Sequence, residues 1–509
     1  MRGSNMAQRK IGIGLSYINI LLNAVLGFVY VPILLYYIGK NEYGLYQLVG
    51  SLIAYFSVMD FGMTAAVTRF YTKYKALNDR IGMENILAIA IYGFLGVTII
   101  CLIIGGATYY YLDIIFANSM SSNELIEVRH IFLLLLFNIV VSLSTMVFKS
   151  VINAYERFLF LKGLETIQLI VQPILVVFIL QQYPTAMAVA IIQTFLNIVL
   201  ILARVYYCFV KLKIRIQFHY WDKELLSNFK RLALSVFIVT LIDQVFWKTN
   251  QIILGVIQGT AAVAVYSIAS LIYMNYMALS TSISGVYLPY VTELVAKRRP
   301  MREISNLFIQ IGRWQYYLLA LVATGFIIFG KQFIQMWAGD GFSDAYWITI
   351  IIILPFTIDL IQNLGITILQ AMNQYGLRAK VYFVIGVINL LGAIPLALLY
   401  GGIGCAVATG ITMLIGNGLI MNYLYDKYIG IDIKQFWSQI ARISIVVFVC
   451  LVIGFVLNTI LVSESKVIFL LKIIGYMILY GLSVYLFAMN LDEKRKVFSV
   501  VNKVFKVEI

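Results

Sequence analysis

The sequence predicts an all-α polytopic membrane protein with about fourteen spanning helices. Three observations support this fold class. Apolar residues make up 62% of the 509 residues and charged residues only 12%, which excludes a water-soluble globular protein. Apolar runs long enough to cross the hydrocarbon core follow one another almost from end to end. Basic residues gather at every second gap between these runs, as expected for an even number of crossings.

The individual spans follow from the apolar runs, taken in chain order. We place them at residues 11–38, 43–68, 85–112, 129–152, 162–181, 185–208, 231–257, 260–288, 305–330, 345–372, 378–399, 402–425, 436–461 and 467–490. The basic gaps lie near residues 69–80, 157–162, 211–231, 297–302, 378–380 and 427–434 and in the tail after 494. Because cytoplasmic loops carry the excess of Lys and Arg, we expect both termini in the cytoplasm and localisation in a bacterial cytoplasmic (inner) membrane.

A weak internal repeat, at an offset of about 220 residues, indicates how the spans are grouped. Segment Asn153–Phe158 is echoed by Gln370–Tyr375, Gly44–Tyr46 by Ala264–Tyr266, and Pro173 by Pro395. Because each copy holds six helices, both copies start on the cytoplasmic side, and we expect two six-helix lobes related by a pseudo-twofold along the membrane normal. The predicted organisation begins with a cytoplasmic N-terminus at 1–10, in which Met1 to Ser4 look like a cloning remnant. Two lobes follow at 11–208 and 231–425, joined by a cytoplasmic linker at 209–230. The chain continues with two added helices at 436–490 and a cytoplasmic basic tail at 491–509.

Polar residues inside the spans are the candidates for function, since a charge in lipid is costly unless it faces a cavity or a partner. On the seventh span, Gln244, Lys248 and Gln251 recur at helical spacing and form one stripe. Asp243 and Asn250 lie beside this stripe. The pattern predicts either a cavity wall that meets an ionic substrate or an Asp243–Lys248 pair that only holds helices together.

Other intramembrane charges lie on the second, fourth and tenth spans. Asp359 is close to the middle of the tenth span, with Pro355 one turn earlier as a hinge, and it suits a coupling cation, a proton or a locally hydrogen-bonded kink. Asp60 lies in the inner half of the second span, where Lys149 of the fourth span is a candidate partner. Arg69 and Lys149 also suit basic side chains that reach the membrane interface.

Several function classes are disfavoured. The four cysteines are scattered in apolar runs and the two histidines lie near helix ends, so we predict no disulfide framework, no metal site and no cofactor. Gly325–Lys331 matches the GxxxxGK pattern, but Gln332 replaces the Ser or Thr that would bind magnesium. The net charge of +15 lies beside helix ends, where it faces anionic lipid, and we predict no nucleic-acid partner.

The segments Glu42–Gly44, Asp60–Met63, Ala65–Ala66 and Arg69–Phe70 together resemble the opening signature of the polysaccharide flippases. These are the Wzx-type members of the multidrug/oligosaccharidyl-lipid/polysaccharide (MOP) exporter superfamily, which includes the MATE transporters. The resemblance implies two lobes that alternate between inward and outward openings around a cationic cavity. It also implies a transporter rather than an enzyme, which moves a polyprenyl-pyrophosphate-linked oligosaccharide, such as an O-antigen or other surface polysaccharide repeat unit, from the cytoplasmic to the outer leaflet.

The resemblance also implies roles for the polar residues. Arg69, Lys149 and Lys248 become candidates for pyrophosphate contact, while Asp60, Asp243 and Asp359 become candidates for ion coupling or gating. The coupling cation, Na⁺ or H⁺, is left open. Expected partners are the lipid-linked glycan, membrane lipids and polysaccharide-assembly proteins, with the monomer as the functional unit.

Two alternatives stay open at this point. An ion-coupled multidrug or metabolite antiporter of the same superfamily would have about twelve helices, and the extra pair argues modestly against it. A membrane glycan polymerase or ligase would have a similar helix number, but such enzymes usually carry a large outer loop with catalytic groups. The outer gaps of this chain are short.

Overall fold

The computed structural model of the protein describes the backbone of residues 2–221, 223–461 and 465–505. Within these ranges, side chains are described except at 2–17, 20, 223–236, 239, 375 and 500–505. Among the described residues, 11 helical segments are long and apolar enough to cross a membrane. The predicted all-α polytopic fold class is therefore confirmed.

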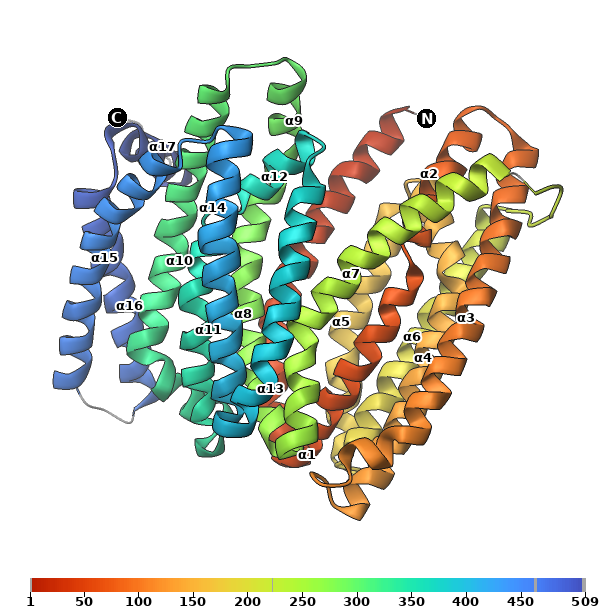
Figure 1. The fold of residues 1–509 in the computed structure, drawn as a ribbon, viewed down its shortest axis with the longest axis horizontal. Coiled ribbons are helices and arrows are strands. Elements are labelled where there is room, and N and C mark those ends of the chain that lie inside the picture. The colour runs from red at the N-terminus through yellow and green to blue at the C-terminus, as the bar shows by residue number, and fades with distance from the viewer. Residues whose placement is uncertain (1, 222, 462–464, 506–509) are drawn as a thin grey trace. The chain divides into compact units, whose positions relative to one another are not determined.

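The helices occupy nearly the whole described chain (Figure 1). The first part contains α1 (Arg2–Ser57), η1 (Val58–Asp60), α2 (Met63–Ala76), α3 (Arg80–Phe116), α4 (Ser122–Ala154), α5 (Phe158–Leu180), α6 (Ala186–Tyr206), η2 (Tyr207–Lys211) and α7 (Lys223–Gln258). The second part contains α8 (Thr260–Val286), α9 (Leu288–Ala296), α10 (Met301–Ala338), η3 (Asp340–Phe342), α11 (Asp344–Leu360), α12 (Leu364–Ala371), α13 (Tyr375–Met413), η4 (Leu414–Ile420), α14 (Met421–Leu424), η5 (Tyr425–Ile429), α15 (Ile433–Ile460), α16 (Lys466–Ser483), η6 (Val484–Ala488) and α17 (Leu491–Phe505).

Two of the 11 segments each contain two predicted crossings, joined through a single glycine. Gly39 has φ 76° inside α1 and Gly401 has φ 58° inside α13, in the left-handed region that glycine adopts at little cost. The chain reverses direction at these points without a separate loop. The sequence predicts short outer gaps between the spans, and these two gaps are reduced to a single non-helical residue each. Together with α7, the segments account for all fourteen predicted crossings.

Side-chain caps fix where several helices begin. Asp79 accepts a hydrogen bond from the Gly82 N–H (2.9 Å) at the start of α3, and Thr185 accepts one from the Ala188 N–H (3.3 Å) at the start of α6. Ser121 and Glu124 form a reciprocal capping box at the start of α4. These caps satisfy N–H groups that have no partner within the helix, so the polar gaps between the apolar runs become helix boundaries.

The chain forms two compact units. Unit 1 comprises Met1–Ser267 and Ala393–Gly402. Within it, α4 packs against α3 and α6, and α1 packs against α5 (Figure 1). Helix α7 belongs to this unit because it packs against α1, α2 and α3. The predicted lobe boundary at 209–230 differs from this division, and the two functional lobes stay a prediction.

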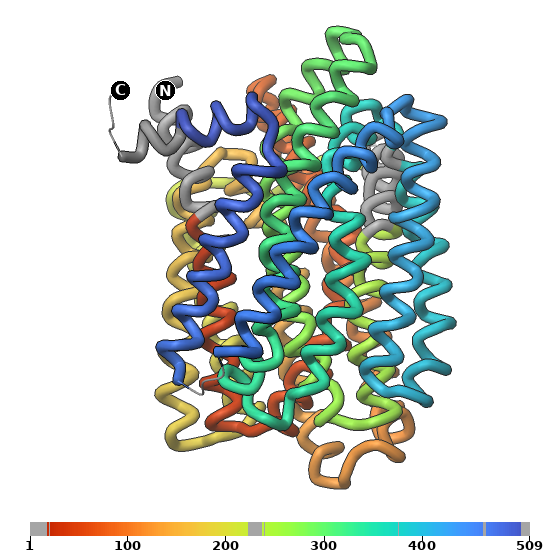
Figure 2. Tube along the Cα trace, turned by 90° about the vertical axis from the view of Figure 1, so that its left-hand side faces the viewer, coloured from red at the N-terminus to blue at the C-terminus, as the bar shows by residue number. Residues whose placement is uncertain are grey.

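Unit 2 comprises Ile268–Gly392 and Ile403–Ile509. Within it, α10 packs against α11, α15 and α16, and the last two spanning helices lie side by side along α10 (Figures 1 and 2). The sequence predicts these two helices as an addition to the repeat.

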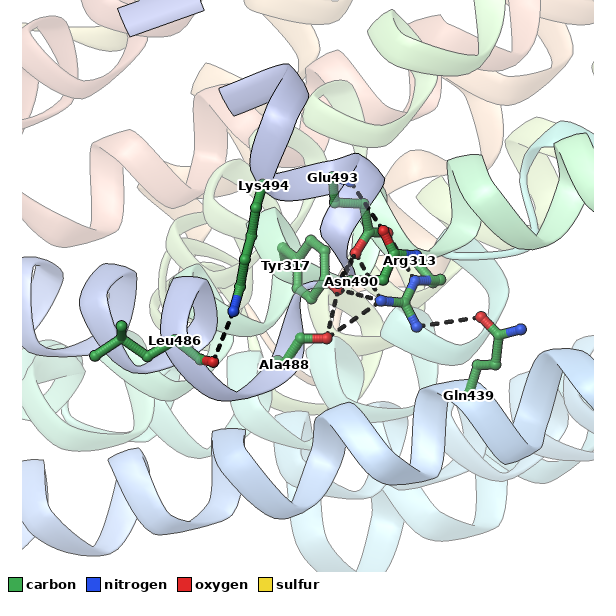
Figure 3. Close-up of polar contacts among 8 residues, drawn as sticks. All are labelled: Arg313, Tyr317, Gln439, Leu486, Ala488, Asn490, Glu493 and Lys494. Atoms are coloured by element: carbon green, nitrogen blue, oxygen red, sulfur yellow. Dashed lines mark hydrogen bonds and ion pairs between the residues drawn. The ribbon is translucent and has the colours of Figure 1, made fainter. Parts of the chain in front are cut away.

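A buried ion pair attaches α17 to unit 2 (Figure 3). The Arg313 guanidinium on α10 donates to both carboxylate oxygens of Glu493 on α17, each at 2.7 Å. Arg313 also donates to Tyr317 (2.7 Å) and to the Gln439 Oε1 (3.1 Å). Asn490 and Glu493 exchange hydrogen bonds of 2.9 Å that cap the start of α17. The beginning of the predicted basic tail is therefore a helix held against the membrane domain.

Candidate functional site

A polar cavity of about 420 Å³ lies inside unit 1. Its lining combines amide and hydroxyl side chains from α1, α4, α5 and α6 with one side chain from α7. The residues are Tyr46, Gln47, Gly50, Ser51, Ile53, Ala54, Ser57, Leu135, Asn138, Ile139, Ser142, Gln168, Gln193, Asn197 and Lys248. Such a lining supplies both hydrogen-bond donors and hydrogen-bond acceptors, so it can bind a molecule that is rich in hydroxyl groups.

Hydrogen bonds between helices fix the positions of these amides. Asn197 on α6 donates to Asn138 and, at 2.7 Å, to the hydroxyl of Ser142, both on α4. Tyr46 on α1 donates to the Gln193 Oε1 on α6. The wall of the cavity is thus a cross-linked set of polar groups that extends over three helices.

Lys248 is the charged group among the described residues of this lining. Its side chain is half-buried, and no described carboxylate lies within 4 Å of its Nζ atom. An ammonium group in a partly buried site attracts an anion more strongly than it would in water. Of the two predictions for the stripe on the seventh span, this position fits the cavity wall.

The other residues of the α7 stripe have different surroundings. Gln251 is buried, accepts a hydrogen bond from Ser51 of α1 and donates to the Ser267 hydroxyl of α8 at 3.1 Å. Asn250 is buried and donates to the Tyr266 hydroxyl at 2.8 Å. Gln244 and Asp243 are half-buried and outside the cavity lining. Two of the predicted substrate contacts, Asn250 and Gln251, therefore tie α7 to its neighbours.

Asp60, Arg69 and Lys149, the charged residues predicted as candidates on the second and fourth spans, lie only partly together in the structure. Asp60 in η1 accepts a hydrogen bond from the Thr64 hydroxyl (2.8 Å), and the charge of Lys149 acts on it. The ion pair that Lys149 makes within 4 Å is with Glu165 of α5, at 3.7 Å between Nζ and Oε1. Arg69 is exposed on α2 and outside the cavity lining.

Asp359 lies in unit 2, on α11, just before a break in the helix. Residues 361–363 form turns between α11 and α12, with Pro355 one turn before Asp359, so the predicted hinge coincides with a real interruption. The charge of Arg378 on α13 acts on Asp359. Asn363 in the break donates to the Ser280 hydroxyl on α8 at 3.3 Å.

Sequence reasoning missed most of the cavity wall, including Gln47, Asn138, Gln193 and Asn197. A usable signal was present, because polar residues recur at i and i+4 within apolar spans as Gln47 with Ser51, Asn138 with Ser142, and Gln193 with Asn197. Uncharged pairs of this kind attract less notice than a charge in a span, although the helix places both members on one face.

Comparisons with known proteins agree with this architecture. A family model described as "Polysaccharide biosynthesis protein" matches residues 11–295, which is more than half of the chain. A curated relative, the probable low-salt glycan biosynthesis flippase Agl15 of Haloferax volcanii, is 25% identical over 191 residues, or 37% of this chain. The match spans 39% of that relative's length.

Solved structures show the same fold at low sequence identity. The lipid II flippase MurJ in an inward closed conformation aligns with a TM-score of 0.75 and 17% identity over 93% of this chain and 98% of MurJ. An inward-facing multidrug resistance MATE family transporter of the MOP superfamily aligns with a TM-score of 0.60 and 11% identity, over 82% of this chain and 96% of that transporter. The chain therefore belongs to the polysaccharide biosynthesis protein family, and it is a multi-pass membrane protein that shares the fold of MurJ and of the MATE transporter.

Proposed function

We propose that the protein moves a polyprenyl-pyrophosphate-linked oligosaccharide from the cytoplasmic to the outer leaflet by alternating access. The cargo would be a repeat unit of a surface polysaccharide, and the membrane a bacterial cytoplasmic membrane with both termini of the chain inside. The protein would act as a transporter and not as an enzyme. The family match and the resemblance to a glycan biosynthesis flippase support the class of cargo.

The observation that carries the proposal is the chemistry of the unit 1 cavity. Sugars present hydroxyl groups, which both donate and accept hydrogen bonds, and the cavity offers amides and hydroxyls that do the same. Lys248 adds a cation in a position where an anionic headgroup would lose part of its hydration. A lining of neutral amides with a lysine does not suit a carrier of lipophilic cations, because the lysine repels a cation and the amides offer little apolar surface.

The physical task fits a carrier of this kind. A pyrophosphate joined to several sugars cannot cross hydrocarbon unaided, since burial of an unpaired charge costs many kcal/mol. The polyprenyl tail needs no such help and can stay in the bilayer. The protein has only to shelter the polar head while access alternates between the two sides.

Ion coupling is the second part of the proposal. We assign it to Asp359, with Asp60 and Asp243 as further candidates. The helix break at 361–363 supports Asp359, because interrupted helices free backbone carbonyls that can help to bind a cation. Na⁺ and H⁺ are distinguished by measuring transport in sodium-free buffer at several pH values.

The experiment that tests the cargo is complementation of a strain that lacks its own polysaccharide flippase. Expression of the chain is expected to restore surface polysaccharide, whereas Lys248→Gln, at equal protein level, should restore much less. Undiminished accumulation of the lipid-linked precursor with the wild-type chain would contradict the proposal. Efflux of cationic dyes without any effect on the precursor would favour the antiporter.

A further inference from the structure

Two lysines share one carboxylate at the predicted cytoplasmic ends of α4 and α5, and the charge of an arginine on α6 acts on the same group. The Nζ of Lys162 lies 2.8 Å from Glu165 Oε2, and the Nζ of Lys149 lies 3.7 Å from Glu165 Oε1. The charge of Arg204 on α6 acts on the same carboxylate. Both oxygens of Glu165 are thus shared among more cations than one carboxylate can neutralise.

The cluster keeps a net positive charge even when Asp60, on which Lys149 also acts, is included. Like charges held close together near a membrane repel one another, so such an arrangement is costly without a further anion. The lysines are accessible to a ligand, because the Lys149 and Lys162 side chains are 40% and 34% exposed.

Arg204 supplies a second, independent indication. Its Nε atom is buried and has no hydrogen-bond acceptor among the residues that the structure describes. A buried donor without an acceptor is destabilising, and an oxyanion is one ligand that would satisfy it in a guanidinium. The Nε atoms of Arg129 and Arg157 are buried in the same way, but Arg204 is the one of these three whose charge acts on Glu165.

The cluster lies in line with the polar cavity. Lys149 follows the lining residue Ser142 by two turns on α4, and Arg204 follows Asn197 by two turns on α6, a rise of about 10 Å in each helix. On α5, Glu165 precedes the lining residue Gln168 by about one turn. One helical face on each of three helices therefore connects the cluster to the cavity.

The depth of the cluster suits a phosphate at the membrane surface. Lys162 is four residues from the start of α5 and Lys149 five from the end of α4, so both lie about 6 to 8 Å inside these helices. The phosphate of a lipid-linked substrate that waits in the inner leaflet lies at headgroup depth.

We propose that Lys149, Lys162 and Arg204 form a loading site for the phosphate group of a lipid-linked anion, with the Glu165 carboxylate between the two lysines as their partner until the phosphate arrives. The inference rests on the proposed function, because it takes this anion to be the polyprenyl pyrophosphate of the cargo. In this arrangement the sugars enter the amide-lined cavity while the phosphate is held at its inner end. Lys248 then offers the next cation as the headgroup moves deeper.

The test is the affinity of the purified full-length protein for inorganic pyrophosphate and for farnesyl pyrophosphate, by titration calorimetry. Arg204→Gln and Lys162→Gln should each weaken binding about tenfold, the loss of one charge-assisted hydrogen bond. Arg204→Lys should retain most of the affinity. Lys73→Gln, which removes an exposed charge from α2, is the matched control and should change nothing.

Glu165→Gln separates a ligand site from a structural ion cluster by the sign of its effect. Removal of the competing carboxylate should tighten pyrophosphate binding, again by about tenfold. A structural cluster would instead lose thermal stability without a gain in affinity, and that result would overturn the proposal. Equal affinities of Arg204→Gln and Lys73→Gln would overturn it as well.

A competition experiment identifies the source of the phosphate. Phosphatidylglycerol in mixed micelles should displace farnesyl pyrophosphate only weakly, and displacement at equal concentration would assign the site to ordinary phospholipid and contradict the cargo. The binding titration does not depend on export. Normal titrations with no glycan export would leave the anion site standing and refute the proposed function, whereas export that is insensitive to Arg204→Gln would refute the site alone.

Discussion

Arg313 on α10 and Glu493 on α17 form a two-pronged ion pair, with both N–O distances at 2.7 Å and the carboxylate only 2% exposed (Figure 3). A pair this well hydrogen-bonded and this deeply buried makes α17 part of unit 2 rather than a loose tail. Loss of one partner leaves the other charge buried without compensation.

Glu493→Gln is therefore expected to destabilise the protein by about 3 to 5 kcal/mol. The measurement is thermal unfolding of the purified protein in detergent. Glu303→Gln is the matched control, because Glu303 makes an exposed pair with Arg299 at 4.0 Å and should contribute less than about 1 kcal/mol. Similar unfolding temperatures for the two variants would refute the role of the buried pair.

The same carboxylate gives a pH prediction. Burial opposes ionisation of Glu493, but hydrogen bonds from Arg313, Asn490 and Tyr317 outweigh it and hold its pKa below the ordinary value. A lowered pKa stabilises the fold above the unfolded-state value of about 4.3, and this contribution is lost as the pH falls through the lower, folded-state pKa. As the pH falls below about 4.3, the unfolding temperature of the wild type should therefore decrease more steeply than that of Glu493→Gln. An equal pH dependence of the two unfolding temperatures would contradict the lowered pKa of Glu493.

Lys248→Gln should reduce glycan export at least tenfold without a loss of protein in the membrane, because the cavity lining loses its cation. Lys248→Arg should keep most of the activity. Lys427→Gln removes an exposed charge elsewhere and serves as the control. Full export by Lys248→Gln would remove this residue from the mechanism.

Gly44→Ala tests the close approach of α1 to the start of α8 within unit 1. A Cβ atom at Gly44 would lie 1.9 Å from the backbone oxygen of Thr260, which has no flexible end that can move aside. We expect a loss of about 1 to 3 kcal/mol from overpacking, measured by thermal unfolding. Gly96→Ala on α3 meets no atom within 4 Å and should be neutral or slightly stabilising, so equal effects of the two substitutions would argue against this contact.

Much of the fold could be predicted because lipid imposes a simple rule on sequence. Apolar length fixes the crossings, and every predicted span lies mainly in helix, although several helices extend beyond the predicted bounds. Two predicted spans, 43–68 and 345–372, are each interrupted by turns, at 61–62 and at 361–363. The joins at Gly39 and Gly401 and the break at 361–363 are local backbone events that hydropathy does not register, although Pro355 indicates the last of them.

The candidate site was predicted less completely, for a physical reason. Lys248 is found from sequence alone because a charge in a span needs a partner or a cavity. The neutral amides at Asn138 and Asn197 satisfy each other and need no charged partner, so only their i, i+4 spacing to Ser142 and Gln193 marks them in the sequence. The cluster around Glu165 combines three helices whose order along the chain does not reveal that their basic residues act on one carboxylate.

The central claim, transport of a lipid-linked glycan, is tested most directly in proteoliposomes that contain the purified chain and a labelled polyprenyl-pyrophosphate oligosaccharide loaded in one leaflet. A membrane-impermeant glycosidase reports how fast the sugar reaches the opposite leaflet. The account predicts rapid exposure of the sugar that depends on the protein and drops with Lys248→Gln. Exposure no faster than in protein-free liposomes would contradict it.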